Sequence, residues 1–121
     1  MTGSLGQALQ ALRDASGLLM VSVVGADGLV VEAAADPGVD VESLSAMAVS
    51  GLLMMDALGQ ELEEGSARQA ILEYGESVVI LTPLDDDLLL VTVARGDFNL
   101  GRMRLIIRRF VDQISSAVAA I

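Results

Sequence analysis

The segment at residues 41–62 constrains the fold more than any other part of the sequence, because it has helical spacing and is apolar on nearly every face. Asp40 is positioned to cap its first turn, where the acidic side chain of Glu42 is also favourable. A helix of this kind is buried on two sides, because neither face is suited to water. The face expected to cover a sheet carries Leu44, Met47, Ala48, Gly51, Leu52, Met54, Met55, Leu58 and Leu62. The opposite face carries Ala46, Val49, Leu53 and Ala57 among Ser45, Ser50, Asp56 and Gln60.

Five aliphatic runs joined by tight turns predict the sheet that this helix covers. The first turn, at residues 25–28, contains two glycines and an aspartate, which tolerate the backbone angles of a hairpin loop. The later joints, at residues 75–76 and 85–87, are also short enough for hairpins, so neighbouring strands are expected to be antiparallel. The predicted strands are residues 18–24, 29–34, 68–74, 77–84 and 88–94.

Two further helices are predicted at the ends of the chain. Ser4 and Gln7 have the spacing of a capping box at the start of an amphipathic helix that ends near Gly17. A last helix is expected to begin after Asn99 or Asp97 and to run close to the C-terminus. The order helix, strand, strand, helix, three strands, helix predicts an α/β fold of the α+β sandwich type. It has a five-stranded antiparallel sheet with helices on both faces, in a single domain over residues 1–121.

The last helix is predicted to be amphipathic in the ordinary way. Its sheet-facing side carries Leu100, Met103, Ile106, Ile107, Phe110, Val111, Ile114 and Val118. The other side carries Arg102, Arg104, Arg108 and Arg109, with Leu105 as its one large apolar residue. These arginines are interpreted as a solvated face; contact with an acidic partner or an anionic lipid surface is the alternative.

Three missing residue types limit the chemistry that the chain can perform. It contains no Cys and no His, and all seven basic residues are Arg, so there is no Lys. These absences exclude thiolate nucleophiles, Cys-ligated zinc, His general bases, P-loop NTPases and Schiff-base enzymes. Asp85, Asp86 and Asp87 are interpreted as a solvated turn rather than a cation site. No catalytic residue, metal ligand or cofactor is therefore predicted, and the protein is not expected to be an enzyme.

The net charge of −10 argues against a nucleic-acid partner, because binding phosphates requires a basic surface. No run of ~18 apolar residues predicts a membrane span, and the N-terminus does not have the pattern of a signal peptide. The expected location is therefore the cytoplasm.

A contact with another chain is predicted from the outer face of the second helix and from the strand at residues 68–74. That strand lacks Pro and follows a crossover, so we expect it at a sheet edge, where it can pair with another edge. Two copies related by a two-fold axis would join these strands antiparallel. Cover by the last helix or a loop is the alternative for the helix face. The candidate contact residues are Ala46, Val49, Ser50, Leu53, Asp56, Ala57, Arg68, Ala70, Leu72 and Tyr74.

The element order and several local motifs resemble the Roadblock (dynein light-chain) superfamily, and within it the bacterial MglB-like proteins. The hairpin around Gly25-Ala26-Asp27-Gly28-Leu29-Val30 is similar to the first hairpin of that family. The Ala- and Met-rich helix at 41–62 is similar to its second helix. The strand at 88–93, followed by Asn99-Leu100-Gly101 and an Arg-rich helix, is similar to its last strand and last helix.

This resemblance implies a profilin-like, Roadblock architecture and a homodimer in which the third strands and second helices meet. It also implies a Ras-like small GTPase as partner, bound by a regulator or scaffold. In the MglB-like branch the dimer stimulates GTP hydrolysis by remodelling the GTPase switch regions, without an arginine finger. The alternative function is a ligand-sensing domain of the profilin-like or PAS-like kind, with a pocket between sheet and helix.

Overall fold

The computed structural model describes residues 2–85 and 87–121, and the predicted elements occur in the predicted order. Asp86, in the turn predicted at 85–87, lies outside the described residues. Ser4 lies inside the first helix rather than at its cap, so the predicted capping box is wrong. The elements are α1 (Thr2–Ser16), β1 (Met20–Gly25), β2 (Val30–Ala35), α2 (Val41–Glu61), β3 (Ala70–Glu73), β4 (Ser77–Asp85), β5 (Leu88–Arg95) and α3 (Leu100–Ala119).

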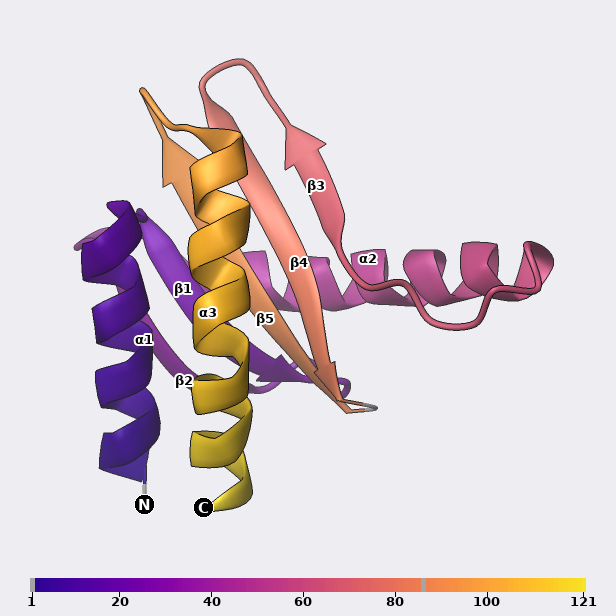
Figure 1. Ribbon diagram of the computed structural model, residues 1–121, viewed down its shortest axis with the longest axis horizontal. Coiled ribbons are helices and arrows are strands. Elements are labelled where there is room, and N and C mark those ends of the chain that lie inside the picture. The colour runs from indigo at the N-terminus through magenta and orange to yellow at the C-terminus, as the bar shows by residue number, and fades with distance from the viewer. Residues whose placement is uncertain (1, 86) are drawn as a thin grey trace.

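The sheet has five antiparallel strands in the order β2-β1-β5-β4-β3 (Figure 1). The β1–β2 turn depends on Gly28, whose φ of 84° lies in the left-handed region. Asp27 stabilises the same turn by accepting a hydrogen bond from the Leu29 amide at 3.0 Å. β3 lies at an edge of the sheet, as predicted, but it is shorter than predicted and Arg68 precedes it.

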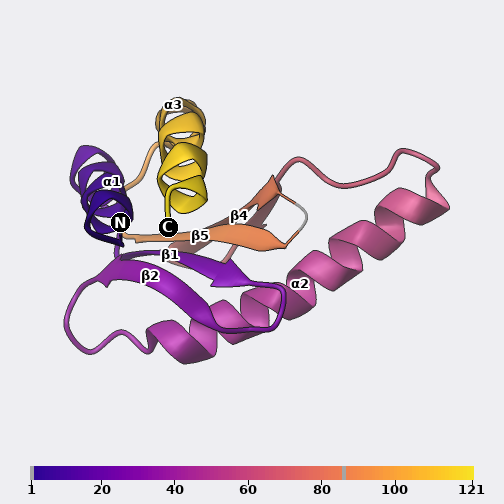
Figure 2. The ribbon, with the colours of Figure 1, turned by 90° about the horizontal axis from the view of Figure 1, so that it is seen from below.

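Helices cover both faces of the sheet, which confirms the predicted fold class. α1 and α3 lie side by side on one face, and α2 lies on the other (Figure 2). The first layer of core is aliphatic and includes Leu5, Leu9 and Ile114, all fully buried. The second layer, between α2 and the sheet, includes Leu52 and Leu89.

α3 has the predicted orientation. Met103, Ile107 and Ile114 are buried against the sheet, and the four arginines of the helix are exposed. Asn99 is the N-cap: its side-chain oxygen accepts a hydrogen bond from the Arg102 amide at 2.9 Å. The choice between Asn99 and Asp97 is thereby settled.

α2 is capped by Asp40, as predicted, but it is rotated relative to the prediction. Its buried residues are Ser45, Ala48, Val49, Leu52 and Gly59. Met47, Met54, Leu58 and Leu62, predicted to face the sheet, are 62–70% exposed. Val49, predicted to face outward, is 8% exposed. A polar contact accompanies this rotation: the Ser45 hydroxyl lies 2.8 Å from the Ser22 hydroxyl of β1, and both side chains are fully buried.

The C-terminal half of α2 extends beyond the sheet on the side of β3 (Figures 1 and 2). The following loop folds back on the helix at Gly59, where a Cβ atom would lie 1.7 Å from the Gly65 carbonyl oxygen. By length and composition, α2 is apolar enough to cross a membrane, which was not predicted from the sequence. Its residues Ala48, Val49 and Leu52 are buried in the core beneath the helix.

A candidate protein-interaction surface

An apolar groove separates α2 from the β3 side of the sheet and has a volume of about 330 Å³. It exists because α2 lies mainly over β1 and β2 and leaves the faces of β3 and β4 less covered. At Gly51 the helix comes so close that a Cβ atom would lie 3.1 Å from the Leu81 side chain. The groove is lined by Leu19, Leu44, Met47, Ala48, Gly51, Leu72, Tyr74, Ser77, Val79, Leu81, Val91, Val93 and Arg95.

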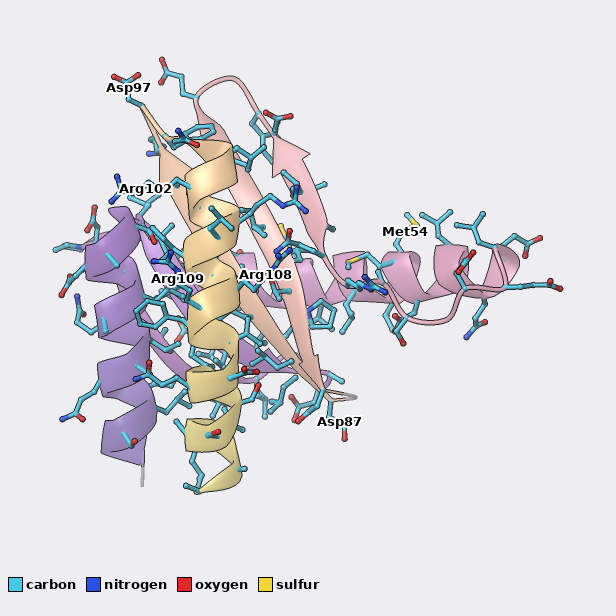
Figure 3. The ribbon with its side chains drawn as sticks, in the orientation of Figure 1. Met54, Asp87, Asp97, Arg102, Arg108 and Arg109 are labelled. Atoms are coloured by element: carbon cyan, nitrogen blue, oxygen red, sulfur yellow. The ribbon has the colours of Figure 1, made fainter. Side chains whose placement is uncertain are left out.

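The exposed side of α2 forms a continuous stripe, which we call the outer stripe. It consists of Ala46, Met47, Ser50, Leu53, Met54, Ala57 and Leu58. Leu53 is 67% exposed and Met54 is 69% exposed. Each residue of the outer stripe has another member three or four residues away along the sequence, so they all lie on one side of the helix. Figure 3 shows Met54 on this extension, away from α1 and α3.

The edge strand β3 borders the groove. In the described part of the chain it pairs with β4 alone, so its other side offers backbone donors and acceptors to a partner strand. Leu72 is 42% exposed and Tyr74 is 63% exposed, and both line the groove. The groove, the outer stripe and the β3 edge therefore form one apolar region on the α2 side of the molecule.

The predicted contact residues do not all lie in this region. Ala46, Ser50, Leu53 and Ala57 lie on the outer stripe, and Leu72 and Tyr74 line the groove. Ala70 is half-buried in the core beneath α2, and Asp56 is half-buried beside Leu84 and Asp85.

Two of the predicted contact residues lie elsewhere. Val49 is buried against the sheet, and Arg68 lines a cleft that also involves α3, on the opposite side of the sheet. Three residues of the outer stripe were not among the predicted contacts: Met47, Met54 and Leu58. Their helical spacing from Leu53 was a usable signal, but the predicted rotation of α2 assigned them to the sheet.

The region has little that could act on a substrate. Within residues 2–85 and 87–121, no group of three or more Asp and Glu side chains is arranged to hold a metal ion. Polar side chains in the groove are few; Arg95 uses its Nε to donate a hydrogen bond to the Ser77 hydroxyl at 3.3 Å. The chemistry of the region is that of an apolar contact.

A family model for the Roadblock/LC7 domain matches residues 5–94. The chain belongs to the Roadblock/LC7 family. No curated protein sequence matches it significantly.

This Roadblock/LC7 chain also resembles solved structures. MglB of Myxococcus xanthus superposes with a TM-score of 0.89 at 18% sequence identity, covering 97% of this chain and 96% of that one. A Roadblock/LC7 domain from Streptomyces avermitilis has 29% identity and a TM-score of 0.69, covering 91% and 97%. Profilin IA of Acanthamoeba castellanii has 15% identity and a TM-score of 0.65, covering 93% and 98%. The Roadblock and profilin-like architecture is thereby confirmed.

Proposed function

We propose that this Roadblock/LC7 chain is a non-catalytic homodimer that binds a Ras-like small GTPase in the cytoplasm, as a scaffold or as a stimulator of GTP hydrolysis. The observation that carries the homodimer is the position of the outer stripe. It extends past β3, on the same side of the sheet as the apolar groove. No membrane span or nucleic-acid partner is part of the proposal.

The two surfaces fit a second copy of this chain. If the β3 edges of two copies pair antiparallel, the second sheet begins where the first one ends, above the extension of α2. The outer stripe of each copy then lies against the groove of the other, as an isologous interface requires. Full burial of a Leu or Met side chain contributes about 1.5–3 kcal/mol, so the largely exposed Leu53, Met54 and Leu58 favour this arrangement strongly.

Family membership supports the Ras-like partner. The resemblance to MglB-like proteins implies a dimer that acts on the switch regions of the GTPase itself. This mode needs an extended contact surface rather than catalytic side chains, which agrees with the missing His, Cys and Lys.

The ligand-sensing alternative would use the groove as a pocket. The groove has an open, mainly apolar lining with few polar groups to orient a small molecule. The same lining suits the leucines and methionines of a second α2, so we favour the dimer.

The dimer is tested by measuring solution mass with light scattering for wild type, for Leu53→Glu with Met54→Glu, and for Leu105→Glu. Leu105 is a matched control, because it is 55% exposed on α3, on the opposite side of the sheet. We expect a dimer for wild type and Leu105→Glu. The double variant is expected to dissociate at least about 100-fold more readily, because it places charges in an apolar interface. A monomeric wild type, or a double variant that dimerises as well as wild type, would contradict the proposal.

The GTPase is tested separately. GTP hydrolysis by a Ras-like GTPase from the same genome is measured alone, with wild type, and with the Leu53→Glu, Met54→Glu variant. We expect wild type to bind the GTPase or accelerate its hydrolysis, and the monomeric variant to lose that effect. An absence of both binding and acceleration with a dimeric wild type would refute the GTPase while leaving the dimer intact.

A further inference from the structure

A second concavity lies on the face of the sheet that carries α1 and α3. It has a volume of about 570 Å³ and separates α3 from β4 and the segment that precedes β3. We call it the arginine cleft, because Arg68, Arg104 and Arg108 line it. Arg104 and Arg108 are four residues apart, so they project from the same flank of α3. Figure 3 shows Arg108 on the β4 side of α3, whereas Arg102 and Arg109 lie on the α1 side.

The cleft contains a chain of side-chain hydrogen bonds that positions one of these arginines. Thr82 of β4 is 7% exposed, and its hydroxyl accepts a hydrogen bond from the side-chain Nε2 of Gln69 at 3.3 Å. The Gln69 side-chain oxygen accepts a hydrogen bond from the Nε of Arg104 at 3.0 Å. This bond uses the Nε–H and leaves the two terminal nitrogens of the guanidinium available to bind an anion.

These arginines lack carboxylate partners. Among the described residues, the one pair of side chains that forms a salt bridge is Arg13 with Asp36, and neither of these residues lines the cleft. Asp112 lines the cleft but lies beyond ion-pair distance from Arg104 and Arg108. The protein has 17 acidic and seven basic residues, yet three of its arginines line one cleft and form no salt bridge with a carboxylate among the described residues. Such a site is electrostatically complementary to an anion.

We propose that the arginine cleft binds an acidic segment of a partner protein, in which carboxylates alternate with aliphatic side chains. Guanidinium groups pair with carboxylates through two parallel hydrogen bonds, and Ile107 and Val111 add apolar contacts in the same cleft. A concave site accepts an inserted peptide better than a flat membrane surface. The cleft is formed within one chain, so the proposal does not depend on the dimer or on the GTPase.

The test is the binding of a short fluorescent peptide of glutamates and leucines, followed by anisotropy. The same peptide with glutamines in place of the glutamates is the ligand control. Wild type is compared with two double variants. The cleft variant carries Arg104→Gln and Arg108→Gln, and the second variant carries Arg102→Gln and Arg109→Gln. The second variant is matched, because it removes the same charge from the same helix on the flank away from the cleft. All four side chains are exposed, so both variants are expected to fold.

We expect wild type to bind the acidic peptide, and to bind it less well at about 0.5 M salt than at about 0.05 M salt. The cleft variant should bind about tenfold more weakly, whereas the matched variant should stay within about twofold of wild type. Equal weakening of the two variants would overturn the proposal, since general charge would then explain binding. The proposal would also be overturned if the acidic peptide does not bind to wild type. Phosphatidylserine vesicles are the second probe: if they bind, lose binding in the Arg104→Gln, Arg108→Gln variant, and the peptide does not bind, the cleft would be a lipid site instead.

Discussion

The buried pair Ser22 and Ser45 offers a sharp test of how much one polar contact between α2 and β1 contributes to stability. The two hydroxyl oxygens lie 2.8 Å apart and both side chains are fully buried. Ser45→Ala alone leaves the Ser22 hydroxyl buried without this partner, which costs about 1–3 kcal/mol of unfolding free energy. Ser22→Ala alone is expected to cost a similar amount. The double variant removes both hydroxyls and is expected to be nearly neutral, so the two effects should be strongly non-additive.

The assay is urea unfolding of the two single variants, the double variant and wild type, all at one protomer concentration, because dimer stability depends on concentration. Ser116→Ala, at an exposed position of α3, is the matched control and should stay within about 0.5 kcal/mol of wild type. The reasoning is refuted if the double variant is destabilised by the sum of the single variants. It is also refuted if either single variant is as stable as wild type.

Two further predictions concern helix ends. Gly59→Ala should destabilise the protein by at least about 2 kcal/mol in the same assay, because its Cβ would overlap the Gly65 carbonyl oxygen. Gly75→Ala, where an added Cβ would meet no atom within 4 Å, should be close to neutral, and an equal loss in both would contradict the steric reason. Asn99→Ala should cost about 1 kcal/mol by removing the hydrogen bond to the Arg102 amide. Asn99→Asp should retain that stability, and a loss as large as that of Asn99→Ala would argue against the cap.

Most of the fold was predictable, because its elements have patterns that depend on near neighbours. α3 has one apolar side and one charged side, so only one orientation buries Met103 and the three isoleucines of the helix. The β1–β2 hairpin follows from Asp27 and Gly28, which form the turn by themselves. The edge position of β3 was also correct, because a crossover from α2 and two successive hairpins lead to that strand order.

The residues of the candidate surface were predicted only in part. Leu53, Leu72 and Tyr74 are exposed in it as expected, whereas Val49 is buried and Arg68 lies on the other side of the sheet. A helix that is apolar nearly all round gives a weak periodic signal for its rotation. Leu44, Ala48, Leu52 and Met55 pack in the core beneath α2 as predicted, whereas Met47, Met54 and Leu58 are exposed. The observed rotation includes a contact between two buried serines that are 23 residues apart, and apolar periodicity does not predict such a contact.

The sequence by itself determined the identity and order of the elements, the aliphatic core and the lack of His, Cys and Lys chemistry. These properties depend on residue type and on spacing along a helix or strand. Only the tertiary structure decided that α2 extends past β3 and leaves a groove, and that Arg104 and Arg108 of α3 line one cleft together with Arg68. The physical reason is that the shape of a surface depends on where each helix or strand ends relative to its neighbours in the fold. That relation depends on packing and strand order in three dimensions, which local spacing does not encode.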